Sequence, residues 1–173
     1  MKHLVLGGAR SGKTSFGEQA ALALASTISN STKPIYLATA QAFDDEMRAR
    51  ITRHQIDRAD RFVTIEEPLE LETILLAMTN QIVLIDCLTL WLTNKMLDGH
   101  ETEAATSHLC SAVRAFKGDL VVISNEVGWG IVPETPLGRV FRDAQGRLNQ
   151  AMAQVCDRVT LVVAGLPLTL KET

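Results

Sequence analysis

The feature of the sequence that most constrains its fold is a glycine-rich turn near the N-terminus. Residues 7–14 read Gly-Gly-Ala-Arg-Ser-Gly-Lys-Thr, directly after the apolar run at residues 4–6 and before a segment with helical spacing. A glycine, four further residues and then Gly-Lys-Thr, placed between a strand and a helix, is typical of a phosphate-binding loop. The turn therefore predicts an α/β chain whose first buried strand ends at an anion site.

The residue types in this turn suit a nucleoside triphosphate. Its glycines permit backbone angles that point successive N–H groups at one anion, and the helix that follows adds the positive end of its dipole. Lys13 supplies a charge for the β- and γ-phosphates, and the Thr14 hydroxyl suits Mg²⁺. A plain strand–helix turn is the alternative. The expected phosphate contacts are Gly7, Gly8, Ala9, Arg10, Ser11, Gly12, Lys13 and Thr14.

Composition favours one globular domain spanning residues 1–173, with 46% hydrophobic and 21% charged residues. The net charge of -3 and the lack of any Lys/Arg run give no reason to expect a nucleic-acid partner. No apolar run reaches the roughly 18 residues of a membrane span, so we expect a cytoplasmic protein without one. Cys87, Cys110 and Cys156 lack metal-like spacing, which predicts reduced thiols in packed surroundings.

Apolar runs alternate with helical segments along the whole chain. The sequence predicts strands at 2–6, 35–39, 62–65, 82–86, 120–123 and 159–163, the last being the final strand. It predicts helices at 15–26, 44–56, 88–96, 101–116 and 137–156, and another opened by residues 66–68 that runs through Met78. Strands that are apolar throughout indicate a parallel sheet covered on both faces. The expected fold is a P-loop NTPase-type (RecA-like), doubly wound α/β domain.

Ligands of such sheets bind beyond the carboxyl ends of the strands. Residues 39–41, Asp86, Asn125 and Glu126 should therefore lie near the glycine-rich turn. Asp86 ends an apolar strand, which predicts a carboxylate that helps to hold Mg²⁺, directly or through water. Capping of the following helix is the alternative.

His54 falls among Arg50, Arg53 and Arg58 on the helix expected at 44–56. A surface residue is one interpretation of this histidine, and a nucleophile is the other. Imidazole, with a pKa of about 6.5, is largely neutral at neutral pH, and neighbouring guanidinium groups would keep it so while binding a phosphate.

The segment at 125–133, Asn-Glu-Val-Gly-Trp-Gly-Ile-Val-Pro, is unusually apolar for a loop. It either folds back on the core or forms an apolar wall that faces the substrate. On the helix that follows, Arg139, Arg142 and Asp143 share a face, which is either a solvated surface or a site for an acidic group.

Taken together, these residues resemble the bifunctional adenosylcobinamide kinase / adenosylcobinamide-phosphate guanylyltransferase family of cobalamin biosynthesis. The stretches that carry the resemblance are residues 7–14, 36–39, 44–47 with Arg50, Ile51 and His54, 86–94, 125–133 and 141–150, and they span nearly the whole chain. The stretches at 125–133 and 141–150 are together highly specific to this family.

The resemblance implies an enzyme with two steps. In the first, the aminopropanol hydroxyl of adenosylcobinamide attacks the γ-phosphate of GTP or ATP, with Lys13, Thr14, Mg²⁺ and Asp86 stabilising the transfer. In the second, His54 attacks the α-phosphate of GTP and carries GMP to adenosylcobinamide phosphate, giving adenosylcobinamide-GDP. Relatives form trimers, so the resemblance also implies a homo-oligomer.

The resemblance further implies a set of residues that contact the nucleotide. Beyond the 7–14 turn these are Ala38, Thr39, Ala40, Gln55, Ile56, Asp57, Arg58, Glu66 and Asp86, with Thr14 and Asp86 as the metal ligands. Relatives often have proline after the residue aligned with Arg58, where this chain has Ala59. Two other functions stay open: a small-molecule P-loop kinase without nucleotidyl transfer, and a non-catalytic, nucleotide-dependent regulatory protein.

Overall fold

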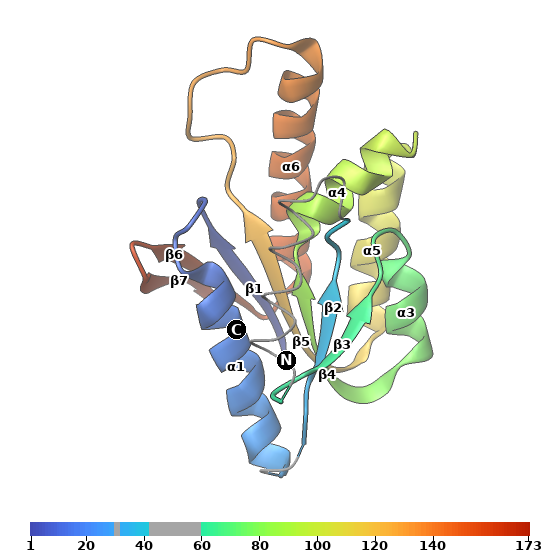
Figure 1. Cartoon of the computed structure of the whole chain (residues 1–173), viewed down its shortest axis with the longest axis vertical. Coiled ribbons are helices and arrows are strands. Elements are labelled where there is room, and N and C mark those ends of the chain that lie inside the picture. Colours follow the sequence, from blue (N-terminus) through green and yellow to red (C-terminus); the bar gives the residue numbers. More distant parts are fainter. Residues whose placement is uncertain (30–31, 42–59) are drawn as a thin grey trace.

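The structure is a computed structural model that describes residues 1–29, 32–41 and 60–173. Within them one sheet of seven strands has the order β3-β2-β4-β5-β1-β6-β7 (Figure 1), and all pairs but β6–β7 are parallel. The strands are β1 Lys2–Gly7, β2 Ile35–Ala38, β3 Val63–Glu66, β4 Thr79–Asp86, β5 Lys117–Asn125, β6 Arg158–Val163 and β7 Leu166–Glu172. The helices are α1 Lys13–Ile28, α3 Leu71–Ala77, α4 Leu88–Leu97, α5 Thr102–Ala115 and α6 Pro136–Val155.

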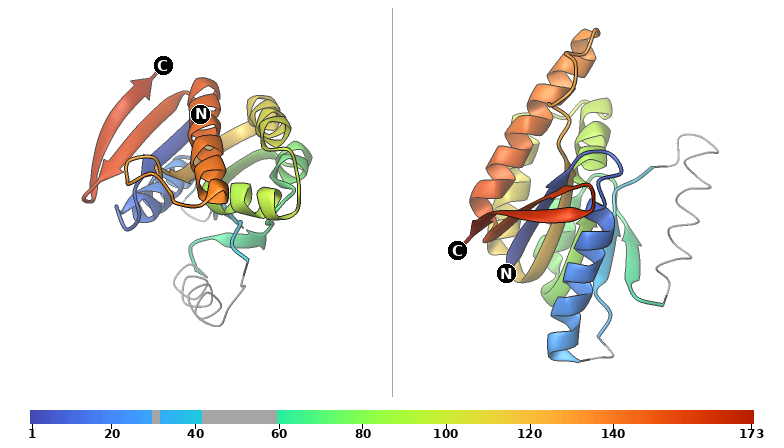
Figure 2. Two further views of the ribbon diagram at one scale, coloured as in Figure 1. Left: turned by 90° about the horizontal axis from the view of Figure 1, so that it is seen from above. Right: turned by 90° about the vertical axis from the view of Figure 1, so that its left-hand side faces the viewer.

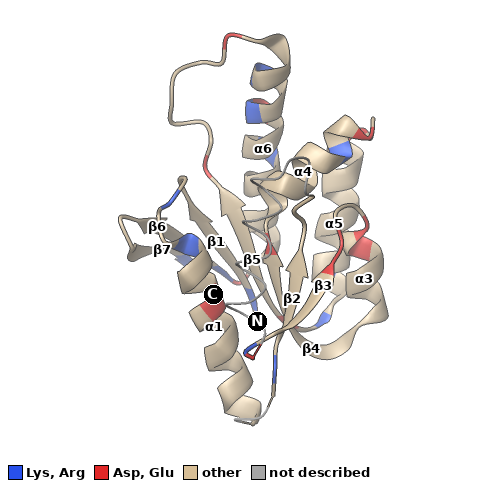
Figure 3. Ribbon diagram, viewed as in Figure 1, with Lys and Arg blue, Asp and Glu red and all other residues tan. Residues whose placement is uncertain are grey.

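The sheet is covered on both faces, because its central strands are apolar on both sides. Helix α1 packs on one face, and α3, α4, α5 and α6 pack on the other (Figure 2). Charged residues lie mainly on the helices and at strand ends (Figure 3). This arrangement confirms the predicted P-loop NTPase-type, doubly wound α/β fold, in which β5 separates the loop-bearing strand β1 from β4.

Helix α1 approaches the sheet closely through small residues. Gly17, Ala21 and Ala25 are buried along it. A Cβ atom at Gly17 would lie 2.9 Å from the Cδ1 atom of Ile123 in β5, so any larger side chain there would push the helix away. This packing places the N-terminus of α1, and with it Lys13, at the carboxyl end of β1.

The prediction that residues 159–163 form the final strand is wrong. Ala164 and Gly165, with φ angles of 51° and 79°, form a turn into β7, which pairs antiparallel with β6. The strand β7 contains Pro167 and lies at the edge of the sheet, where a missing N–H disrupts no inner ladder. The alternation of Leu166, Leu168 and Leu170 was the overlooked sequence signal.

The helix predicted to run through Met78 is present as α3, but the prediction that residues 66–68 open it is wrong, because α3 begins at Leu71. Glu66 completes β3, and the backbone N–H of Glu67 donates to the Ala38 carbonyl at 2.9 Å. The Glu67 carboxylate then accepts hydrogen bonds from the backbone N–H groups of Leu69 and Glu70, at 2.9 and 2.8 Å. These bonds hold a turn ahead of the helix. The helix expected at 44–56 lies outside the described residues.

Cys87, Cys110 and Cys156 are free and buried, as predicted. Burial and the neighbouring Asp86 carboxylate raise the pKa of Cys87 to about 11. Burial, with the carboxylate of Asp157, raises the pKa of Cys156 to about 12. Both thiols therefore stay protonated and unreactive at neutral pH.

His3 gives the fold a dependence on pH. Its imidazole is 2% exposed and lies 2.8 Å from the Thr160 hydroxyl; burial and the charge of Arg158 lower its pKa to about 4. The unfolded chain takes up this proton near pH 6.5, whereas the folded chain resists it until about pH 4, so stability falls as the pH drops between these values.

We expect His3 to account for about 2 kcal/mol of stability lost between about pH 8 and about pH 5, from the difference between the two pKa values. Urea denaturation of the wild type and of His3→Gln across this range measures it. Over this pH range the free energy of unfolding should fall by about 2 kcal/mol less in the variant than in the wild type. An unchanged pH dependence in the variant would show that His3 is not the group responsible.

Candidate active site

The glycine-rich turn has the backbone geometry of an anion-binding loop. Arg10 and Gly12 have φ angles of 57° and 95°, and the Ser11 N–H donates to the Gly8 carbonyl at 3.3 Å. The turn between β6 and β7 supports the loop from outside, since the Gly165 N–H donates to the Ser11 carbonyl at 2.8 Å. A Cβ atom at Gly7 would lie 2.7 Å from the Val162 carbonyl oxygen, so the loop leaves β1 where only glycine fits.

Lys13 is the first residue of α1, and its side chain turns back over the loop. Its Nζ donates to the Gly8 carbonyl at 3.0 Å, and the residue is only 9% exposed. The ammonium group is thus held above the turn whose N–H groups would meet phosphate. Thr14, the next residue, is half-buried on the first turn of α1, while Ala9 and Arg10 are exposed at the tip of the loop.

Asp86 lies at the carboxyl end of β4, in register with Ala38 of β2. The phenol of Tyr36 donates a hydrogen bond to the Asp86 carboxylate, and Tyr36 itself is buried against Phe62 in an edge-to-face contact of 5.6 Å. Asp86 does not cap α4, whose N-cap residue is Cys87. The capping alternative is therefore wrong, and a buried phenol fixes the direction of the carboxylate.

Thr39 ties the end of β2 to the turn between β4 and α4. Its hydroxyl donates to the Cys87 carbonyl and accepts from the Cys87 N–H, both at 2.8 Å. Asn94 of α4 donates to the carbonyls of Thr39 and Pro68, at 2.8 and 3.1 Å. The Thr39 N–H donates to the Asp86 carbonyl at 3.2 Å, so both the side chain and the backbone of Thr39 hold this edge of the sheet together. Sequence reasoning gave Asn94 no role, because its partners are distant in the chain.

The predicted nucleotide contacts fall into two groups. Residues 7–14, 38–40, 66 and 86 lie at the carboxyl edge of the sheet, on β1, β2, β3 and β4 and the turns that follow. Glu66 pairs in register with Ala38 and is exposed. His54, Gln55, Ile56, Asp57 and Arg58 lie outside the described residues.

The segment at 125–133 does not fold back on the core. Trp129, Ile131 and Val132 are 70%, 98% and 58% exposed, so this interpretation is wrong and the loop presents apolar side chains to the outside. Arg139 donates to the carbonyls of Pro133 and Glu134, at 2.9 and 2.7 Å, and so holds the end of this loop. On α6, Arg142 pairs with its neighbour Asp143.

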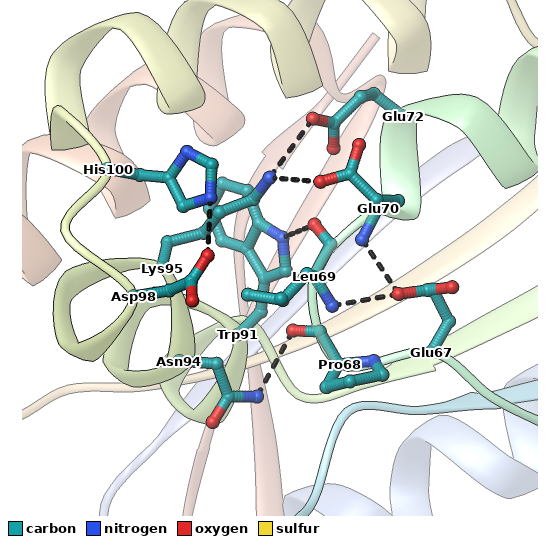
Figure 4. Close-up of polar contacts among 10 residues, drawn as sticks. All are labelled: Glu67, Pro68, Leu69, Glu70, Glu72, Trp91, Asn94, Lys95, Asp98 and His100. Atoms are coloured by element: carbon teal, nitrogen blue, oxygen red, sulfur yellow. Dashed lines mark hydrogen bonds and ion pairs between the residues drawn. The ribbon is translucent and has the colours of Figure 1, made fainter.

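Lys95 anchors the connection between β3 and α3 to α4 (Figure 4). Its Nζ lies 2.9 Å from Glu70 and 3.4 Å from Glu72, and the lysine is 2% exposed. The indole N–H of Trp91 donates to the Leu69 carbonyl at 2.8 Å in the same cluster. Burial alone would lower the pKa of Lys95, but the hydrogen bond to Glu70 and the charges of both glutamates outweigh it and raise the pKa.

Replacement of Lys95 by methionine is expected to cost about 2 kcal/mol of unfolding free energy, because Glu72 and Glu70 lose their cation while water solvates them only in part. Urea denaturation measures the loss. Lys117→Met, on an exposed residue at the start of β5, is the control and should change stability by less than about 0.5 kcal/mol. Equal effects of the two substitutions would contradict the anchoring role.

The described residues contain no group of three or more His, Cys, Asp or Glu side chains that could hold a metal ion. Within the same residues no helix has the length and apolar character needed to cross a membrane.

A phosphate loop on an inner strand of a parallel sheet, with a fixed carboxylate two strands away, defines a protein of the P-loop NTPase fold. The chain belongs to the cobinamide kinase / cobinamide phosphate guanyltransferase family, whose model matches residues 3–170.

Curated relatives agree with the family match. The chain is 42% identical to the bifunctional adenosylcobalamin biosynthesis protein CobP of Pseudomonas aeruginosa, with 99% of this chain and 98% of the relative covered. It is 36% identical to the bifunctional adenosylcobalamin biosynthesis protein CobU of Escherichia coli, covering 99% of this chain and all of the relative (100%).

Proposed function

We propose that this chain is a bifunctional enzyme of cobalamin biosynthesis. It phosphorylates the aminopropanol hydroxyl of adenosylcobinamide and then transfers GMP from GTP to the phosphorylated product. The observation that carries the proposal is the phosphate loop, in which Lys13 reaches back to the Gly8 carbonyl at the edge of the sheet that also holds Asp86. The family and its bifunctional relatives supply the substrate class.

In the kinase step the loop binds the triphosphate through its backbone N–H groups and the N-terminus of α1. The Lys13 ammonium neutralises charge that spreads over the γ-phosphate during transfer. We assign Ala38, Thr39 and Ala40, together with the exposed carboxylate of Glu66 at the same edge of the sheet, to contacts with the nucleoside. These assignments are compatible with either ATP or GTP as the phosphate donor.

Mg²⁺ fits the donors present at this edge. Thr14 offers a hydroxyl and Asp86 a carboxylate whose direction the Tyr36 phenol fixes, and hard oxygen donors are those that Mg²⁺ prefers. When bound with the triphosphate, the ion supplies further neutralisation of phosphate charge. Asp86 and Thr14 would hold it.

In the guanylyl step His54 attacks the α-phosphate of GTP, a P–N bond forms and pyrophosphate leaves. The phosphate of adenosylcobinamide phosphate then displaces the histidine and takes the GMP. This relay divides one transfer into two easier ones. Residues 55–58 are the proposed guanine contacts on the same segment.

We further propose that the protein acts in the cytoplasm as a homo-oligomer, a trimer by resemblance to its family. The exposed apolar side chains of Trp129, Ile131 and Val132 are available to a neighbouring subunit or to the corrin ring.

Incubation with adenosylcobinamide, GTP and Mg²⁺ tests the proposal, with chromatography of the corrinoid products over time. We expect adenosylcobinamide phosphate first and adenosylcobinamide-GDP second. Accumulation of the phosphate alone would indicate a kinase without nucleotidyl transfer. Binding of GTP without either product would indicate a regulatory protein.

A further inference from the structure

We propose that Glu126 is the residue that accepts the proton of the substrate hydroxyl in the kinase step, and that Asn149 positions its carboxylate. This inference rests on the proposed kinase activity. Glu126 follows β5, the strand that lies between loop-bearing β1 and Asp86-bearing β4. Figure 1 shows that the chain leaves β5 at the same end of the sheet as the loop after β1.

The backbone of Glu126 is fixed beside the start of the phosphate loop. Asn125 pairs in register with Gly7, and the Glu126 N–H donates to the Gly7 carbonyl at 3.1 Å. On the other side, the Thr89 hydroxyl accepts from the Asn125 N–H at 2.9 Å, which links the same turn to α4. The carboxylate of Glu126 therefore starts from a backbone held on both sides.

The side chain of Glu126 is also held. Asn149, which is 5% exposed on α6, donates from Nδ2 to the Glu126 Oε1 at 2.9 Å and to the Asn125 carbonyl at 3.0 Å. Asn149 is in turn oriented by two fully buried side chains, because its Oδ1 accepts from the Ser124 hydroxyl at 2.7 Å and from Gln145 Nε2 at 3.0 Å. These bonds define which end of the Asn149 amide faces the carboxylate.

A buried polar network of this kind is costly unless it is well paired, and this one is incompletely paired. Among the residues that the structure describes, the Oδ1 of Asn125 and the Oε1 of Gln145 are buried without a hydrogen-bond partner. Apolar residues would pack α6 against β5 at a lower free-energy cost than these buried polar groups. The network therefore suits the orientation of Glu126 better than it suits stability.

The carboxylates of Glu126 and Asp86 differ in their hydrogen-bond partners. The Asp86 carboxylate accepts from the Tyr36 phenol, which suits a metal ligand of fixed direction. Glu126 is half-buried, forms no ion pair within the described residues, and is bonded through Oε1 to a neutral amide that cannot give up a proton. This pairing leaves the Glu126 carboxylate available to a substrate hydroxyl.

The chemical step balances with Glu126 as the acceptor. The hydroxyl oxygen of the aminopropanol arm forms a bond to the γ-phosphorus, and the bond from that phosphorus to the β–γ bridging oxygen breaks. The hydroxyl proton passes to the Glu126 carboxylate, and the nucleoside diphosphate leaves with the bridging oxygen. The proton is released to water after the products depart. A positioned base typically contributes about 100-fold or more to such a transfer.

Single-turnover phosphorylation of adenosylcobinamide by Glu126→Gln tests the proposal, with excess enzyme, ATP and Mg²⁺. We expect the rate constant to fall about 100-fold, while the dissociation constant of the nucleotide with Mg²⁺ changes less than about threefold. Glutamine keeps the shape and can still accept from Asn149. Glu134→Gln, an exposed carboxylate on the same loop, is the matched control and should be unaffected.

Chemical rescue separates a proton acceptor from a structural residue. Glu126→Ala should be slow, and added formate should restore part of its rate, whereas formate should not change Glu134→Ala. A full rate in Glu126→Gln would overturn the proposal. So would loss of Mg²⁺-nucleotide binding as the main defect, or a slow Glu126→Ala variant that formate does not rescue. If the wild type itself makes no adenosylcobinamide phosphate, the proposed function fails instead.

Discussion

Lys13→Ala is expected to slow phosphorylation of adenosylcobinamide by about 1,000-fold, because the variant loses the charge that neutralises the γ-phosphate in the transition state. The wild-type ammonium is 9% exposed and held on the Gly8 carbonyl, so neither water nor a neighbouring cation readily takes its place. Single-turnover rates with ATP and Mg²⁺ measure the loss. Since the lysine stabilises the transition state more than the bound nucleotide, the rate constant should fall more than nucleotide affinity does.

Lys33→Ala is the matched control for this experiment. Lys33 is exposed before β2, at the opposite end of the sheet from the phosphate loop, and its loss should leave the rate within about twofold. Thermal unfolding of both variants checks that each is folded. A folded Lys13→Ala enzyme that phosphorylates adenosylcobinamide at the wild-type rate would show that the loop does not serve this transfer.

The second large effect is expected from His54→Asn, which should abolish formation of adenosylcobinamide-GDP. Asparagine has a similar size but no ring nitrogen that can attack phosphorus, so no GMP can be carried on the protein. The kinase step uses the phosphate loop instead and should keep its rate within about threefold. Chromatography should therefore show adenosylcobinamide phosphate accumulating without the second product.

His108→Asn controls for the loss of a histidine elsewhere, because His108 is exposed on α5. It should form adenosylcobinamide-GDP at the wild-type rate. If His54→Asn also made this product at the wild-type rate, another nucleophile or direct transfer would have to replace the proposed relay.

The parts of the site that depend on neighbouring residues in sequence could be predicted. The Gly-Lys-Thr turn fixes its own geometry, since Gly12 takes a φ of 95° and Lys13 reaches back five residues to Gly8. Asp86 could be placed at the edge of the sheet because an apolar run ends there. Each of these inferences needed only the order of residue types along a few turns of chain.

Contacts between distant segments could not be predicted. The bond between Asn149 and Glu126 spans 23 residues and depends on how α6 packs against β5, and that between Tyr36 and Asp86 spans 50 residues across two strands. The sequence alone does not distinguish a polar residue buried between a helix and the sheet from a polar residue on the solvent-facing side of a helix. The position of β7 at the edge of the sheet, which lets it contain Pro167, likewise depends on how distant strands are ordered.

Labelling of the protein with GTP that carries radioactive phosphorus at the α-position tests whether His54 carries GMP between the two substrates. We expect a covalent GMP adduct that acid removes and base leaves intact, located on the peptide that contains His54 and missing from His54→Asn. An adduct that persists in that variant would contradict the proposed relay, as would production of adenosylcobinamide-GDP by a wild-type protein that never becomes labelled.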